Sequence, residues 1–285
     1  MKNQIKTILL LGVLSALLIA LGGVMGKAYL YGFTLLALAM NLGMYFFSDR
    51  LVLSMHRAKE LSPSEAPLLH ATVQELAQQA GIPKPRVYLI PEHQPNAFAT
   101  GRNPKKGVVA VTQGIMDVLS PRELRGVLAH EIAHIRNRDI LVATVAAAIA
   151  GAISYLGQAL QFGFLFGGAS DEEGDSSIVG GLAMALLAPI IALLIQMGVS
   201  RSREYLADET GARISGDPEA LASALEKLDF AARRVPAGVE PATASLFIVN
   251  PFAGAGSMMN LFSTHPPMRE RIRRLRSMRG TAVYA

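Results

Sequence analysis

The stretch SPRELRGVLAHEIAHIRNRD, residues 120–139, decides how the rest of the chain is interpreted. It opens with Ser120 as a helix cap, Pro121 at the first helical position and Glu123 three residues after the cap, an arrangement typical of a helix N-terminus. Apolar side chains then follow at helical spacing, namely Leu124, Val127, Leu128 and Ile135. The sequence therefore predicts an amphipathic helix that carries HEIAH at residues 130–134.

Within this helix, His130 and His134 lie four residues apart and share one face, so that both imidazoles can reach a single metal ion. Glu131 points to the adjacent side, from which it can hydrogen-bond a water at that ion. This is the HExxH pattern of zinc metallopeptidases. The helix cap and the apolar face favour this interpretation over two histidines that are hydrogen-bonded within a core.

A catalytic zinc needs a third protein ligand and an open position for water. Asn137 and Ile140 stand where the metzincin pattern has Gly and His, so the third ligand has to come from further along the chain. Glu204 and Asp208, in SREYLAD at residues 202–208, are four apart on a second predicted helix. One can bind the metal while the other accepts the N–H of a ligand histidine. The spacing alone does not say which, and an ordinary solvated acidic face is the alternative.

The composition indicates a membrane protein. Of 285 residues, 51% are hydrophobic and 17% are charged, whereas about 25% are charged in ordinary soluble domains. This excludes a disordered, collagen-like or disulfide-scaffold chain, and the absence of cysteine excludes thiolate metal sites and cysteine nucleophiles. Uncharged runs occupy residues 7–25, 28–47, 140–170 and 176–200, each close to the roughly 20 residues that cross a bilayer.

These runs predict two transmembrane hairpins, at residues 1–49 and 140–200. The sequence supports the second hairpin less strongly, because the alanine-rich residues 143–151 partition only weakly into a bilayer and Pro189 interrupts the last run. A hairpin buried in protein or lying in the interface is the alternative. Most of the Lys and Arg that flank the runs lie before the first run, between the second and the third, and after the fourth. The connections inside the two hairpins hold only Lys27 and the acidic stretch 171–175. The positive-inside rule then places both termini on the cytoplasmic side.

Residues 50–139 and 201–285 together supply about 175 residues, enough for one domain with a sizeable core. The first half carries the HExxH helix and the second half carries the third predicted ligand. Helices are predicted at residues 63–81, from residue 120, and at 203–215 and 218–234, with short strands at 86–90, 97–100 and 107–112. The predicted fold class is therefore an α-helical integral membrane protein with four transmembrane helices and a mainly helical α+β domain.

Two further stretches leave alternatives open. Residues 235–263 carry one charge, Glu240, and are either a flap over the cleft or a packed loop. Residues 269–279 hold six arginines around apolar positions, which predicts an amphipathic helix docked on the domain or one that contacts anionic lipid. If the HExxH helix runs on from His134 into the third apolar run, the metal lies roughly 10 Å from the hydrocarbon edge.

Taken together, HEIAH, SREYLAD, the four apolar runs and the segments Asn96-Ala97-Phe98-Ala99 and Thr264-His265-Pro266 resemble the HtpX group of membrane zinc metalloproteases, relatives of the CaaX prenyl proteases. The resemblance covers essentially the whole chain. It implies a gluzincin-type site in which His130, His134 and Glu204 bind one zinc ion per chain. It also implies that Glu131 is the catalytic base and that Asp208 orients a ligand histidine.

The resemblance further implies an endopeptidase on the cytoplasmic face of a bacterial-type inner membrane, acting in stress response and quality control on misfolded or damaged membrane proteins. Asn96 and His265 are implied to contact the substrate or the transition state, His265 as an oxyanion donor, although a structural histidine is the alternative. The strand from Asn96 to Ala99, with Ala97 and Phe98 between them, could pair with an extended substrate.

Two other functions remain as alternatives. A prenyl-protein protease would need an intramembrane chamber for the lipid, and four spans without polar lining offer little support for one. A non-catalytic membrane scaffold would have a structural metal site, but such sites usually have four protein ligands, and here three are found. The expected partners are polypeptide substrates and the lipid bilayer, with no nucleic acid; the sequence predicts no oligomeric state.

Overall fold

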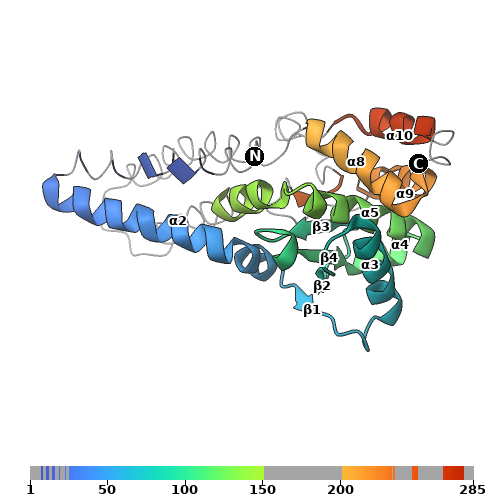
Figure 1. Cartoon of the computed structure of the whole chain (residues 1–285), viewed down its shortest axis with the longest axis horizontal. Helices are drawn as coiled ribbons and strands as arrows, with labels where there is room; N and C mark the ends of the chain where they lie inside the picture. Colours follow the sequence, from blue (N-terminus) through green and yellow to red (C-terminus); the bar gives the residue numbers. More distant parts are fainter. Residues whose placement is uncertain are drawn as a thin grey trace, which may run out of the picture.

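A computed structural model describes residues 26–150, 201–232, 234, 246–249 and 266–278, together with seven single positions between residues 8 and 23. Several predictions from the sequence fall outside these residues: most of the first and third apolar runs, the fourth run, most of residues 235–263, and His265. The described part has an elongated shape, in which one long helix projects from a rounded end that holds the sheet and the other helices (Figure 1).

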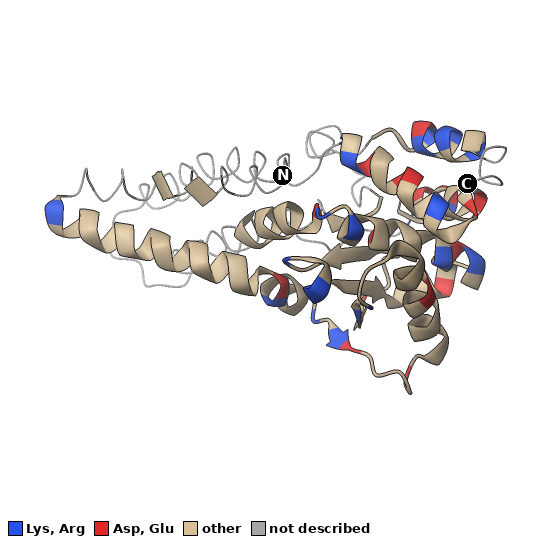
Figure 2. Cartoon of the chain, in the orientation of Figure 1, with Lys and Arg blue, Asp and Glu red and all other residues tan. Residues whose placement is uncertain are grey.

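The projecting helix is α2, Lys27–Met55, whose best window has a mean hydropathy of 1.5 and is almost entirely exposed. At 1.5 Å per residue it is about 43 Å long, enough to cross a bilayer. Its side chains are nearly all uncharged along its length, whereas charged residues gather on the rounded end (Figure 2). Among the described residues it is the one helix long and apolar enough to span a membrane, and Ile140–Ala150 is a shorter apolar helix.

A four-stranded sheet lies at the base of α2. It consists of β1 Lys59–Glu60, β2 Arg86–Ile90, β3 Ala97–Thr100 and β4 Val108–Thr112, in the order β1-β2-β4-β3. β2 and β4 are parallel, with Arg86 opposite Val108, and β3 is antiparallel to β4, with Ala97 opposite Val111. The three predicted strands are confirmed. β3 forms one edge of the sheet.

Helices cover the sheet and close the core. They are α3 Pro67–Ala80, α4 Gln113–Val118, α5 Pro121–Arg136, α8 Arg201–Ser215, α9 Pro218–Ala232 and α10 Met268–Ser277, with the short 3-10 helix η1 Pro104–Lys106. The predicted helices are confirmed, although α3 begins at Pro67 because Glu65 accepts hydrogen bonds from Ser62 and holds the preceding residues in a turn. α4 and β1 were not predicted.

The helix α5 lies at the centre of this arrangement and contacts β3, β4, α3, α8 and α9 (Figure 1). One apolar core joins side chains from before and after residues 151–200, among them Val127, Leu128, Ala207, Leu225 and Leu275. Burial of apolar surface therefore binds the two parts of the sequence into one packed body.

The end of α5 corrects one prediction. The helix does not run on into the third apolar run: it ends at Arg136, and Arg138 adopts a left-handed backbone with φ of 57°. A separate apolar helix then begins at Ile140. The chain bends here, and the bend turns Asp139 back toward α5, as described below. A continuous helix would have placed the metal roughly 10 Å from the hydrocarbon edge. Because α5 ends at Arg136, this distance no longer follows.

Candidate metal centre

The helix α5 begins with the predicted capping box. The Ser120 hydroxyl accepts from the backbone N–H of Glu123, and the Glu123 carboxylate accepts from the N–H of Ser120 at 2.9 Å. The next two turns are buried, which fixes the rotation of the helix about its axis. As a result, His130 and His134 project from the same face, and their Nε2 atoms lie 3.1 Å apart.

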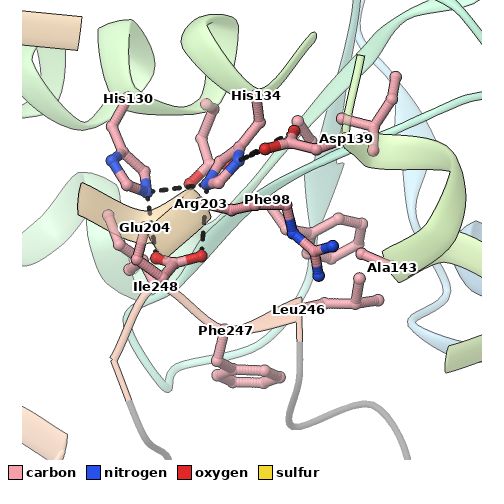
Figure 3. A pocket seen from close by; sticks show the side chains of 13 residues that line it. Phe98, His130, His134, Asp139, Ala143, Arg203, Glu204, Leu246, Phe247 and Ile248 are labelled. Atoms are coloured by element: carbon pink, nitrogen blue, oxygen red, sulfur yellow. Dashed lines mark hydrogen bonds and ion pairs between the residues drawn. The ribbon is translucent and has the colours of Figure 1, made fainter. Parts of the chain in front are cut away.

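Glu204 reaches the same point from α8. Its carboxylate oxygens lie 3.6 Å from Nε2 of His130 and 3.6 Å from Nε2 of His134 (Figure 3). The three ligand atoms all lie within 4.8 Å of one another. In a tetrahedral zinc site with bonds of about 2.0–2.1 Å, neighbouring ligand atoms are about 3.3 Å apart. The donor set and its spacing therefore fit a zinc ion bound by two imidazoles and one carboxylate.

This approach of α8 to α5 depends on Gly211. A Cβ atom at this position would lie 2.8 Å from the backbone N and 2.9 Å from the Cα of His130. Because both are backbone atoms, neither can move aside without shifting α5. The absence of a side chain at Gly211 is therefore what allows the helix that carries Glu204 to pack directly against the helix that carries His130.

The structure places Glu204 and Asp208, whose roles the spacing left open, at different nitrogens of His130. Glu204 faces the Nε2 atoms, whereas Oδ1 of Asp208 lies 2.9 Å from Nδ1 of His130, on the opposite side of the ring. Asp208 is buried and is held in turn by Arg271 of α10, whose guanidinium nitrogens donate two hydrogen bonds of 2.8 Å to its carboxylate. Arg271 was not singled out from the sequence.

A second carboxylate that the sequence did not indicate serves His134. Both oxygens of Asp139 lie 3.1 Å from Nδ1 of that ring (Figure 3). Asp139 is buried and follows the left-handed residue Arg138, so the bend at the end of α5 brings it back over the helix. The one signal in the sequence is an acidic residue placed just before an apolar run, where its charge would otherwise be unfavourable.

These carboxylates give the site a negative electrostatic potential. Burial alone lowers the pKa of an imidazole, but Asp208 outweighs it and raises the pKa of His130. At His134, Asp139 and then Glu204 outweigh burial and raise the pKa to about 10. An environment that favours positive charge at two neighbouring rings also attracts a divalent cation.

Glu131 is buried and lines the same cavity as the two histidines. Burial raises its pKa above the usual value of a glutamate, and the backbone N–H of Ala99 hydrogen-bonds to its carboxylate and partly offsets this. The residue that the sequence predicts as a proton acceptor is therefore placed between the metal-binding face of α5 and the edge strand β3, with a pKa moved toward neutrality.

The predicted substrate-binding segment borders this cavity. Phe98 and Ala99 line it, and Leu246, Phe247 and Ile248 form another of its walls (Figure 3). Asn96 is buried next to this wall, and its Oδ1 accepts the N–H of Ile248 at 3.1 Å. Its Nδ2 has no hydrogen-bond partner among the described residues. The cavity has a volume of about 50 Å³.

Comparison with known proteins places this site in a family. The model of peptidase family M48 matches residues 63–279. A protease HtpX homolog of Syntrophobacter fumaroxidans is 54% identical over 284 residues, which cover 98% of this chain and 100% of the relative. A protease HtpX homolog of Persephonella marina is 55% identical over 282 residues, with 97% of each chain covered.

A solved structure is similar as well. The crystal structure of S. mikatae Ste24p aligns with a TM-score of 0.50 at 19% identity, over 96% of this chain. The chain spans 65% of the length of that structure. At this level of identity, the likeness shows a shared fold.

Proposed function

The chain belongs to peptidase family M48 and to the HtpX proteases within it, and on this premise we propose that His130, His134 and Glu204 hold its catalytic zinc and that Glu131 is its general base. The protein is a membrane-anchored, zinc-dependent metallopeptidase. The observation that supports the residue roles most directly is the convergence of three ligand atoms within 4.8 Å, beside a cavity that Glu131 also lines.

When bound, zinc supplies a Lewis acid that polarises the scissile carbonyl and makes an attacking water more acidic. Glu131 accepts the proton of that water and then donates it to the departing amine nitrogen. Burial raises the pKa of Glu131, which makes its carboxylate a stronger base for the first of these transfers. Asp208 and Asp139 hold the two imidazoles by Nδ1, so that Nε2 of each ring is free to face the metal.

We propose that the peptide substrate lies along β3, from Asn96 through Ala97 and Phe98 to Ala99. β3 is an edge strand, and the backbone of Ala99 contacts Glu131, so a strand added there would pass the proton acceptor. The Nδ2 of Asn96 has no hydrogen-bond partner among the described residues, and we propose it as a donor to a substrate carbonyl. Main-chain pairing of this kind tolerates many side chains and suits a protease that acts on misfolded chains.

His265 is proposed as a further donor to the oxyanion. It directly precedes Pro266, where the described chain resumes, and Arg271 of the helix that follows reaches the metal centre. A short connection therefore joins His265 to a residue at the site. This proximity along the chain is what supports a role for His265 near the substrate.

We propose that the chain has four transmembrane spans in a bacterial-type inner membrane, with the catalytic domain and both termini in the cytoplasm. The length and hydropathy of α2 and the distribution of basic residues around the apolar runs support this orientation. A site held next to apolar helices suits misfolded or damaged membrane proteins as substrates, which corresponds to a role in quality control.

The test replaces Glu131 with Gln in the detergent-purified protein and measures cleavage of an unfolded polypeptide together with zinc content. We expect zinc to be retained and cleavage to fall by at least about 100-fold, as for loss of a general base. Glu209→Gln is the matched control, because Glu209 lies on the exposed side of α8 and pairs with Arg213. Unchanged cleavage by Glu131→Gln would exclude Glu131 as the base. Cleavage of a prenylated peptide is measured in parallel, which distinguishes a general endopeptidase from the prenyl-protein protease alternative.

A further inference from the structure

Arg271 differs from the other arginines of α10. Arg273 and Arg274 are more than half exposed and pair with Glu270 on the surface, whereas the side chain of Arg271 is completely buried. Burying a guanidinium is costly unless every part of it finds a partner. Its surroundings therefore show what this residue does.

All parts of the Arg271 guanidinium contact the metal centre or the wall of its cavity. Nε and Nη2 donate to the two oxygens of Asp208 at 2.8 Å each, in the bidentate geometry that arginine forms with a carboxylate. Nη1 donates to the carbonyl oxygen of Ile248 at 2.9 Å and lies 3.7 Å from Oε2 of Glu204. Nη2 also lies 3.5 Å from Nε2 of His130, so Arg271 contacts Asp208, the cavity wall and two proposed ligands.

The contact with Asp208 continues to His130. The oxygen that accepts from Nη2 of Arg271 is the same Oδ1 that lies 2.9 Å from Nδ1 of His130. A carboxylate oxygen held beside Nδ1 favours the tautomer of His130 with the proton on Nδ1 and the lone pair on Nε2.

We propose that Arg271 is a positioning residue of the zinc site, which fixes the carboxylate of Asp208 beside Nδ1 of His130 so that this ring presents Nε2 to the metal, and which ties the Ile248 wall to the same centre. This inference rests on the proposed role of His130 as a ligand. It also gives α10 a function: the C-terminal helix completes a site whose ligands all come from α5 and α8. Asn96 holds the N–H of Ile248 and Arg271 holds its carbonyl, so both polar groups of that residue are fixed.

The test compares Arg271→Met, Arg271→Lys and Leu275→Ala in the full chain in detergent. Leu275 is also completely buried on α10, so its truncation reports a loss of packing without a change in the ion pairs. Zinc affinity is measured by competition with a chelator on the folded fraction, and the visible spectrum of the cobalt-substituted protein reports ligand geometry. Thermal melting is recorded for each variant.

For Arg271→Met we expect zinc affinity to fall about 10- to 100-fold, as for loss of groups that orient a metal ligand, with an altered cobalt spectrum. Arg271→Lys should recover part of the affinity, because lysine restores the charge but not the bidentate geometry. Leu275→Ala should lower the melting temperature and leave zinc affinity within about twofold and the cobalt spectrum unchanged. When Asp208→Asn is already present, adding Arg271→Met should lower zinc affinity by less than about a further twofold, because Arg271 acts on the site by way of Asp208.

Two results would overturn the inference. One is zinc affinity of the Arg271→Met protein within about twofold of the unsubstituted chain. The other is an equal loss of affinity in Leu275→Ala, which would reduce Arg271 to a packing residue. Either result leaves the proposed function intact if Glu131→Gln still retains zinc and loses cleavage, so failure of this inference and failure of the proposed function are distinguishable.

Discussion

Asp139 and Asp208 approach the two imidazoles from the side opposite to the proposed metal position. Each lies about one hydrogen-bond length from an Nδ1 atom, Asp139 from His134 and Asp208 from His130. Each histidine of the motif therefore has a carboxylate beside Nδ1, and the two carboxylates come from different parts of the chain. A carboxylate in this position fixes the ring orientation and raises the basicity of the ligand nitrogen.

The first prediction concerns Asp139. Replacing it with Asn keeps the shape of the side chain and removes its charge, so His134 loses the acceptor that favours its ligating tautomer. We expect zinc affinity to fall about 10- to 100-fold, measured by chelator competition. Asp117→Asn is the control, since Asp117 is exposed on α4 and accepts a hydrogen bond from Gln113 on the same helix. Equal zinc affinity in the two variants would show that Asp139 has no part in the site.

At the residue scale, local spacing predicted much of the site and non-local contacts were missed. His130, Glu131 and His134 lie within one helical turn, so their common location follows from helix geometry. Glu204 and Asp208 were both identified, but their division of roles depends on how α8 is rotated against α5, which spacing does not determine. Asp139 and Arg271 reach the site through a left-handed bend and a distant helix, and neither leaves a periodic signal.

At the scale of elements, the crossing of α5 and α8 sets the distance between the ligands. The second prediction is that Gly211→Ala lowers both stability and zinc affinity, because its Cβ would meet backbone atoms of His130 at 2.8–2.9 Å and push α8 away. An overpacked contact of this kind costs roughly 1–3 kcal/mol. Thermal melting and chelator competition measure the two effects.

Gly126→Ala provides a matched control for this prediction. A Cβ at Gly126 would lie 2.6 Å from the backbone N of Leu221, so it disturbs the contact of α5 with α9. We expect a comparable fall in melting temperature with zinc affinity largely kept, because no ligand lies on α9. If both variants lose zinc affinity equally, then the α5–α8 crossing has no special effect on the ligands.

The third prediction concerns the start of α5. Burial raises the pKa of Glu123, but hydrogen bonds from Lys227, Ser120 and Ser223 outweigh it and lower the pKa to about 2. A carboxylate with a lowered pKa in the folded state stabilises the protein above its unfolded pKa of about 4.5 and loses this contribution as the pH falls toward 2. The contribution is of the order of 2 kcal/mol, given that Lys227 is partly exposed to solvent.

The measurement compares the unsubstituted chain with Glu123→Gln by thermal melting between pH 7 and pH 3. The difference in melting temperature should be constant above about pH 5 and should shrink below it, since protonation then removes the charge from the unsubstituted chain as well. Other titrating groups are shared by both proteins and cancel in the difference. A difference that does not change with pH would indicate that the charge of Glu123 is not what stabilises the helix start.

The sequence predicted the elements better than their junctions. The capping box, the strands and the ligand helices follow from local rules that the structure obeys, and α5 begins at the predicted residue. The end of α5 was predicted wrongly, because no Pro or Gly marks it: Arg138 takes a left-handed conformation that usually favours glycine. Burial of Asp139 against His134 compensates for this local strain, and such tertiary compensation is not visible in a single sequence.

At the scale of the whole molecule, one apolar core joins parts of the chain on either side of residues 151–200. The proposed catalytic site therefore cannot form from either part alone, since His130 and His134 lie before this segment and Glu204, Asp208 and Arg271 after it. Both ends of the segment have to return to the same side of the membrane. This requirement agrees with an even number of crossings between residues 140 and 200, which remains a prediction.

The fourth prediction tests that topology. The chain contains no cysteine, so single cysteines report their own positions without any background. In intact cells, Ser64→Cys, exposed before α3, should be protected from a membrane-impermeant maleimide, because the proposed orientation places the catalytic domain in the cytoplasm. Glu173→Cys, in the acidic connection between the third and fourth apolar runs, should be labelled, because two crossings bring this connection to the opposite side. After the membrane is permeabilised, both should react, which controls for accessibility.

Two outcomes would contradict this topology. Protection of Glu173→Cys until permeabilisation would mean that the second hairpin does not cross the bilayer and lies buried in protein or in the interface. Labelling of Ser64→Cys in intact cells would reverse the proposed orientation of the whole molecule.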